Sequence, residues 1–129
     1  IGEKISITKI FPKYCFVLVK PNLSFSTKKV YCKLGKSYNK KKFKLPKYFN
    51  HNNLENDFKN ISINNSLVIR NLIKDLSKLK NAEFVQMTGT GSCCYAAFKN
   101  NNDAKNALKK IKNKYNNYWS LVVENKFSF

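Results

Sequence analysis

The residues best suited to chemistry lie between Met87 and Phe98, where Gly89 and Gly91 are separated by a single residue. The chain has only four glycines, so half of them stand in this segment, and apolar residues flank it on both sides. Glycine reaches positive φ angles and lets a phosphate or another backbone come close. The pattern therefore predicts two strands joined by a tight turn over residues 88–92. A plain hairpin turn needs the same glycines, so the pair alone does not specify a phosphate site.

A second pair with chemical potential is Thr27 and Tyr31, which follow an apolar segment and stand four residues apart. On a helix this spacing puts a hydroxyl and an aromatic ring on one face. The two side chains could face a ligand together. The alternative is structural, with Thr27 as a helix cap and Tyr31 as a core aromatic residue.

The rest of the chain offers no complete catalytic set. His51 is the only histidine and lies in a polar stretch, where we expect a solvated side chain. The seven acidic residues are scattered, and neither a Walker A motif nor a dinucleotide-binding glycine pattern is present. The four cysteines lack CxxC spacing, so we expect buried free thiols and no metal site. The sequence therefore predicts no catalytic residue and no metal ligand in this chain.

The composition is strongly basic, with a formal net charge of +18 and a pI near 9.9. Such a charge fits a polyanionic partner. However, Arg70 is the only arginine among 25 basic residues, and arginine is the usual residue for bidentate phosphate contacts. Lysine, asparagine and isoleucine are abundant together, which an AT-rich genome explains without any partner. No run of about 18 apolar residues indicates a membrane span, and no signal peptide is visible.

The hydrophobic pattern predicts alternating strands and helices along the chain. A capping residue is expected at Ser26 or Thr27, at Asn56 with Asp57, and at Asn102 or Asp103. The expected strands are residues 14–20, 84–88, 93–99 and 119–123. We expect one helix to begin near residue 27, two helices over 54–58 and 66–80, and a fourth that includes Ala104 to Ile111. Residues 35–53 are expected to form a polar loop.

This order predicts an α+β domain of the ferredoxin-like, split βαβ type. We expect residues 1–12 to be the end of a preceding domain or a linker, and residues 13–129 to form the domain itself. The chain begins with Ile1 rather than Met, which favours a fragment of a longer protein.

Three segments in the same order resemble a known enzyme family. Residues 16–27, an apolar strand ending at Pro21 before a Ser/Thr stretch, resemble the opening of the carboxyl-terminal domain of 4-diphosphocytidyl-2-C-methyl-D-erythritol kinases. Asn56-Asp57 is similar to the Asn-Asp pair before that family's long helix. The run Thr88-Gly89-Thr90-Gly91-Ser92-Cys93 is similar to the third signature motif of the galactokinase, homoserine kinase, mevalonate kinase and phosphomevalonate kinase superfamily.

The resemblance implies the carboxyl-terminal part of a two-domain small-molecule kinase. The implied reaction is ATP-dependent phosphorylation of the 2-hydroxyl of 4-diphosphocytidyl-2-C-methyl-D-erythritol, in non-mevalonate isoprenoid biosynthesis. By position, Tyr31 would stack on the cytosine, and Thr27 would lie near the erythritol and the transferring phosphate. The turn from Thr88 to Ser92 would approach the substrate with its backbone N–H groups.

The same resemblance places the catalytic aspartate, the active-site lysine and the ATP loop in an amino-terminal domain outside these 129 residues. ATP and Mg²⁺ would be bound mainly there, so we predict that this chain alone is inactive. The implied partner is the small-molecule substrate, with no membrane and no nucleic acid. The implied location is the bacterial cytoplasm, or a plastid, where this pathway also operates.

Two other readings remain open at the level of sequence. A free-standing basic RNA-binding module would share the ferredoxin-like fold and would need aromatic side chains on its central strands. Phe84, Tyr95 and Phe98 are candidates, but Tyr95 and Phe98 should lie on opposite faces, and no Arg/Lys-Gly-Phe signature is present. A degraded gene fragment that folds without a function is the third reading. The sequence favours the kinase.

Overall fold

The structure is a computed structural model that describes residues 12–34, 50, 52 and 55–125. The predicted polar loop 35–53 and the proposed linker 1–12 lie almost wholly outside these residues. Four strands and four helices follow in the order β1 (Cys15–Lys20), α1 (Thr27–Leu34), α2 (Asp57–Asn65), α3 (Leu67–Ser77), β2 (Phe84–Met87), β3 (Cys94–Phe98), α4 (Asn101–Lys114) and β4 (Trp119–Glu124).

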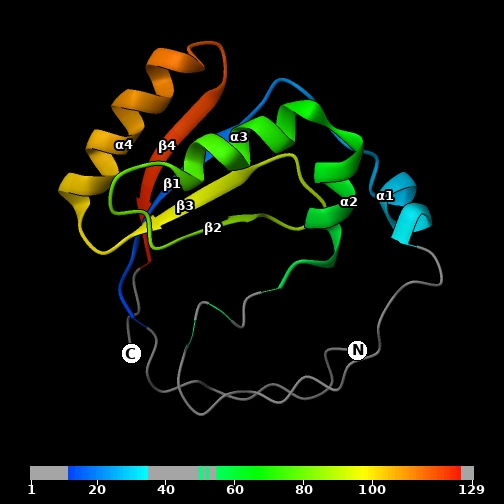
Figure 1. Cartoon of the computed structure of the whole chain (residues 1–129), viewed down its shortest axis with the longest axis horizontal. Coiled ribbons are helices and arrows are strands. Elements are labelled where there is room, and N and C mark those ends of the chain that lie inside the picture. The colour runs from blue at the N-terminus through cyan, green and yellow to red at the C-terminus, as the bar shows by residue number, and fades with distance from the viewer. Residues whose placement is uncertain (1–11, 35–49, 51, 53–54, 126–129) are drawn as a thin grey trace.

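The strands form one antiparallel sheet in the order β2-β3-β1-β4. β1 is central, so Val17 lies opposite Ala96 of β3 on one side and opposite Val122 of β4 on the other. Helices α3 and α4 lie side by side on one face of this sheet (Figure 1). This two-layer arrangement confirms the predicted α+β, ferredoxin-like fold.

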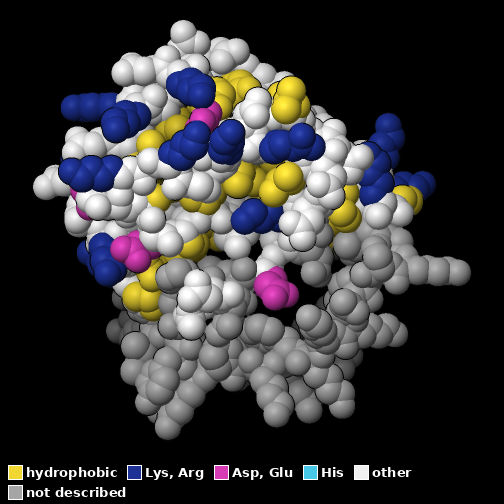
Figure 2. Space-filling view, in the orientation of Figure 1, with side chains coloured by type: hydrophobic (Ala, Val, Ile, Leu, Met, Phe, Trp, Pro, Cys, Tyr) yellow, Lys and Arg dark blue, Asp and Glu magenta, His cyan; other side chains and the backbone are white. Residues whose placement is uncertain are grey.

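The core lies between the sheet and the two helices. Side chains alternate across a strand, so Cys15, Val17 and Val19 of β1 face the helices and are buried. Each of the two helices faces the sheet with apolar residues at helical spacing. The buried helix residues are Ile69, Leu72, Ile73 and Leu76 of α3, and Ala104, Ala107 and Ile111 of α4. The outer surface of these helices carries many lysines (Figure 2).

Two predicted helix starts are wrong. The helix expected over 54–58 begins at Asp57 and continues to Asn65, because the Asn56 side chain caps it and residue 56 is extended. The cap of α4 is Asn100 rather than Asn102 or Asp103, since the Asn100 side chain accepts a hydrogen bond from Asp103 N. Both expected caps therefore lie inside the first turn of α4.

Within the described residues, no helix is long and apolar enough to cross a membrane. The sheet face opposite α3 and α4 is also apolar along β1 and β3. Phe16 and Tyr95 meet edge to face there, with ring centroids 5.6 Å apart, and Tyr14 meets Phe84 in the same way at 5.4 Å. Ala97 shares this face and has no exposed surface.

Candidate functional site

The predicted turn between two strands is present and joins β2 to β3. Thr88 N donates to Cys93 O and Gly91 N donates to Thr88 O, each at 2.9 Å. Gly89 and Gly91 have φ angles of +46° and +93°, and the Gly91–Ser92 peptide bond is cis. The two positive φ angles explain why glycine stands at both positions. We refer to residues 88–92 as the glycine turn.

The two glycines face different surroundings. A side chain at Gly89 would meet nothing within 4 Å, so the backbone is open to an approaching molecule there. A Cβ at Gly91 would lie only 2.9 Å from Met87 Sδ and 2.9 Å from Phe25 Cδ2. Gly89 therefore leaves one side of the turn accessible, and Gly91 allows the other side to pack against the protein.

The glycine turn is joined to the segment that leads from β1 into α1. The Ser92 hydroxyl, which is buried, donates to the Leu23 carbonyl at 2.5 Å. Phe25 of the same segment lies against Gly91. Two regions about 70 residues apart in sequence, both expected to belong to the site, thus meet at one end of the sheet.

This segment ends where α1 begins. Ser26 is the cap, because its hydroxyl accepts from Lys29 N at 3.4 Å and its carbonyl accepts from Val30 N at 3.0 Å. Thr27 is the first residue of α1 and is exposed, and Tyr31 follows one helical turn later. Both predicted substrate-binding residues, Thr27 and Tyr31, therefore lie on α1, the helix that follows the segment contacted by the glycine turn.

A cavity of about 500 Å³ lies beside this segment. It is lined by Ser24, Phe25, Ser26, Lys29, Val30 and Lys33. Lys29 and Lys33 are one helical turn apart and give the cavity a positive rim, which suits an anionic ligand. Neither lysine is among the predicted site residues, although their spacing on α1 is visible in the sequence.

Asn56 does more than cap a helix. Its Oδ1 accepts from Phe58 N at 3.0 Å, which is the expected cap of α2. Its Nδ2 also donates to Met87 O at 2.7 Å and to Gly89 O at 2.8 Å. One carboxamide therefore joins the start of α2 to the glycine turn.

The thiols near the turn are unsuited to nucleophilic chemistry. Burial raises the pKa of the Cys94 thiol to about 12, and burial also raises the pKa of Cys93. A thiol is nucleophilic only as the thiolate, so both remain inert near neutral pH. All four cysteines are free, as expected, but Cys32 is exposed and Cys93 only partly buried, which corrects the expectation that all are buried.

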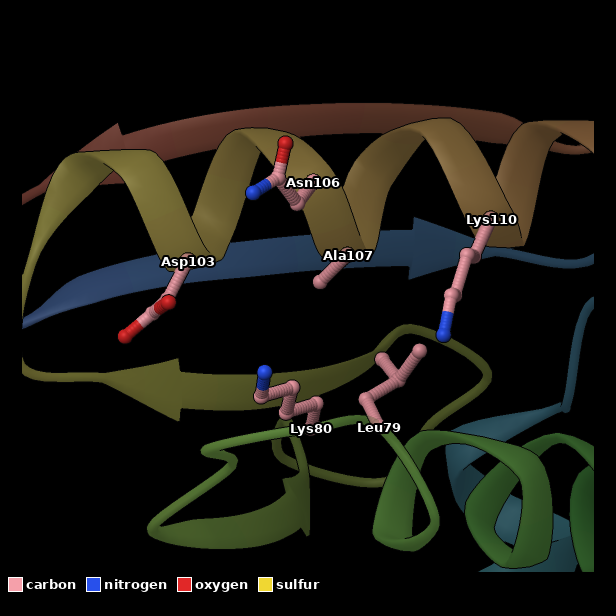
Figure 3. Close-up of a pocket in the computed structure, with 6 residues that line it drawn as sticks. All are labelled: Leu79, Lys80, Asp103, Asn106, Ala107 and Lys110. Carbon is pink, nitrogen blue, oxygen red and sulfur yellow. The ribbon is translucent and has the colours of Figure 1, made fainter.

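A further cleft of about 380 Å³ lies between α4 and the residues that follow α3. Lys80, beside Leu79, and Lys110, which follows Ala107 on α4, extend into it from opposite sides (Figure 3). The glycine turn precedes β3 whereas α4 follows it, so this cleft belongs to the other end of the strand. None of the predicted site residues lines it.

Comparison with known proteins gives consistent matches. Residues 41–117, more than half of the chain, match the family described as "GHMP kinases C terminal". This range contains Asn56 and the glycine turn, whereas Thr27 and Tyr31 precede it. No solved structure shows significant similarity to the chain.

The curated relatives share one name, "4-diphosphocytidyl-2-C-methyl-D-erythritol kinase". The relative from Wigglesworthia glossinidia brevipalpis is 36% identical over 93% of this chain and 38% of its own length. The relative from Clostridium tetani is 34% identical over 90% and 45%, and that from Pelagibacter ubique is 33% identical over 84% and 40%. The chain thus spans less than half the length of the relatives it matches. Its sequence match, its fold and its glycine turn together show that the chain belongs to the GHMP kinase family and corresponds to the carboxyl-terminal domain.

Proposed function

We propose that this chain is the substrate-binding, carboxyl-terminal part of an ATP-dependent kinase that phosphorylates the 2-hydroxyl of 4-diphosphocytidyl-2-C-methyl-D-erythritol. The observation that carries the proposal is the contact between the glycine turn and the segment before α1, through Ser92 and Leu23. The name of the curated relatives supports the choice of substrate. The reaction would take place in the bacterial cytoplasm or in a plastid.

In this proposal each site residue has a separate task. Thr27, exposed at the start of α1, lies near the erythritol and the transferring phosphate. Tyr31, one turn further along the helix, stacks on the cytosine. The backbone of the glycine turn approaches the substrate on the open side of Gly89. The positive cavity beside α1 suits the diphosphate that joins cytidine to erythritol.

The proposed cofactors are ATP and Mg²⁺. In the parts of the chain that the structure describes, no three His, Cys, Asp or Glu side chains gather into a metal-binding group. We assign no step through the metal to these residues. The proposal places ATP, Mg²⁺ and the catalytic groups in the remaining part of the enzyme. This chain by itself is then expected to be inactive.

The first test is to sequence the DNA directly upstream of the codon for Ile1. The proposal expects an in-frame extension that encodes a Gly/Ser-rich phosphate loop and an aspartate-containing catalytic segment. A stop codon, or an initiator just before Ile1, would mean that the chain descends from a kinase but is not part of an active one.

The second test is an assay of the intact protein with 4-diphosphocytidyl-2-C-methyl-D-erythritol and ATP. Thr27→Val is expected to lower kcat/KM roughly tenfold, because a hydrogen bond near the reacting groups is lost. Ser77→Ala is the matched control, since its hydroxyl donates only to Ile73 O on α3. Absence of turnover by the intact wild-type protein would contradict the proposed reaction.

An RNA-binding module is the second candidate because aromatic rings do lie on the central strands. Phe16 of β1 and Tyr95 of β3 are neighbours on the sheet face opposite α3 and α4. Their rings meet edge to face, however, and both residues are partly buried, so they do not form an open stacking platform. Phe98 lies in the core on the other face. A filter-binding titration at rising salt separates the two functions: tight binding that weakens steeply with salt would support RNA binding.

A further inference from the structure

We infer that Asn56 is a positioning residue that holds the glycine turn in its ligand-binding shape. This inference rests on the proposed function, in which the turn approaches the substrate. The geometry that carries it is the double donation from Asn56 Nδ2, to Met87 O at 2.7 Å and to Gly89 O at 2.8 Å. These two carbonyls stand at the base of the turn and within it, so a single side chain fixes both.

The chemistry of the position requires an amide. The Asn56 Oδ1 accepts from Phe58 N while both Nδ2 protons are donated, so both ends of the group are used. A carboxylate would keep the acceptor and cap α2, but it would place negative charge against two carbonyl oxygens. A serine would also cap α2, but it is too short to replace the two donated bonds. Many residues can cap a helix, whereas this arrangement selects asparagine.

The hydrogen bonds from Asn56 to the glycine turn have a consequence for ligand binding. The other side of the turn is fixed by Ser92 on Leu23 and by Gly91 against Phe25. Asn56 adds support from the start of α2, so the turn is held from both sides, while a Cβ at Gly89 would still meet nothing within 4 Å. A turn held in this way loses little conformational freedom when a ligand binds, which favours affinity.

The test compares matched asparagine caps in the 129-residue chain. Asn56→Ser and Asn56→Asp both retain a capping oxygen and lose the donated bonds. Asn100→Ser is the control, because Asn100 caps α4 and its amide donates only to the Asp103 carboxylate. The readout is hydrogen exchange, followed by NMR, at the Gly91 amide, which donates to Thr88 O within the turn.

We expect the Gly91 amide to exchange roughly tenfold faster in both Asn56 variants, because the turn opens more often once the two bonds donated by Asn56 are lost. The amides of α3 should keep their protection, and Asn100→Ser should leave Gly91 unchanged. Unchanged protection of Gly91 in both Asn56 variants would overturn the inference. The milder Asn56→Ser variant keeps the comparison valid if Asn56→Asp does not fold.

A second arm uses the intact kinase. Asn56→Ser should raise KM for the cytidyl substrate roughly tenfold and leave KM for ATP unchanged, whereas a general loss of stability would affect both. An active enzyme whose KM for the cytidyl substrate does not change would overturn the positioning role. If the wild-type enzyme does not use this substrate, the proposed reaction fails, and the exchange experiment still decides whether Asn56 holds the turn.

Discussion

Gly89 and Gly91 share a turn and a positive φ, but they differ in what surrounds them. A Cβ would meet nothing near Gly89 and would collide with Met87 and Phe25 at Gly91. Conformation therefore requires glycine at both positions, and packing requires it at Gly91 as well. Substitution by alanine separates these two requirements.

We expect Gly91→Ala to lower the free energy of unfolding by about 3 kcal/mol, since it adds overpacking to an unfavourable φ of +93°. Gly89→Ala should cost only about 1 kcal/mol, because its φ of +46° lies near the left-handed helical region and space is available. Urea unfolding of both variants measures the difference. Equal losses would show that Phe25 does not pack against the turn as described.

The buried hydroxyl of Ser92 makes a second residue-scale prediction. Ser92→Ala leaves the Leu23 carbonyl without this donor, so we expect a loss of about 1–3 kcal/mol in the free energy of unfolding. Ser77→Ala removes an exposed hydroxyl that bonds Ile73 O within its own helix and should change stability by less than about 0.5 kcal/mol. Urea unfolding of the two variants side by side gives the comparison, and a loss as small at Ser92 as at Ser77 would contradict the contact.

At the scale of elements, α3 and α4 are joined at their carboxyl ends by one acidic side chain. Asp75 of α3 pairs with Lys114 Nζ at 2.8 Å and accepts a hydrogen bond from the Tyr115 hydroxyl. Burial alone would raise the pKa of Asp75, but Lys114 and Tyr115 hold the pKa below its usual value. Tyr115 stacks on Tyr118, which continues this junction toward β4.

This junction predicts a dependence of stability on pH. Because the pKa of Asp75 is lower in the folded state, its contribution is present above the unfolded pKa of about 3.9 and is lost as pH falls through the folded value. Denaturant unfolding between pH 6 and pH 2 should show this loss in the wild type. Asp75→Asn should be less stable at pH 6 and should lose less on acidification; an equal loss in both proteins would contradict the assignment.

The sequence predicts the strands and helices that follow from apolar periodicity. It does not predict which of several neighbouring polar residues caps a helix. β1 and α3 were predicted because their apolar residues repeat at strand and helix spacing. The cap of α4 was wrong because several neighbouring polar residues suit a cap equally, and the geometry of the preceding strand end selects Asn100. The second role of Asn56 could not be predicted, since its partners Met87 and Gly89 come close only in the folded chain.

At the scale of the whole molecule, the described residues have their main core on one side of the sheet. Phe98 of β3 is fully buried in it, whereas Trp119 of β4 is 53% exposed on the edge strand. Two aromatic residues of one sheet thus differ in what they contribute to stability. Among the described residues, no lysine or arginine is buried in this core.

We therefore expect Phe98→Ala to lower the free energy of unfolding by about 3–5 kcal/mol, because a large cavity is left in the core. Trp119→Ser should cost less than about 1 kcal/mol, since half of the side chain is already in solvent. Thermal unfolding followed by circular dichroism checks both. A larger loss at Trp119 than at Phe98 would mean that the edge of β4 is a second centre of stability.

The central position of β1 has a consequence for how the protein is made. Of the four strands described, β1 leaves the ribosome first, yet both of its neighbours, β3 and β4, begin only at Cys94 and Trp119. At synthesis rates of about 5–20 residues per second, this apolar strand waits on the order of several seconds for a partner. During that time both of its edges are open to pairing with other chains. We therefore expect the nascent chain to be most prone to aggregation before β4 emerges.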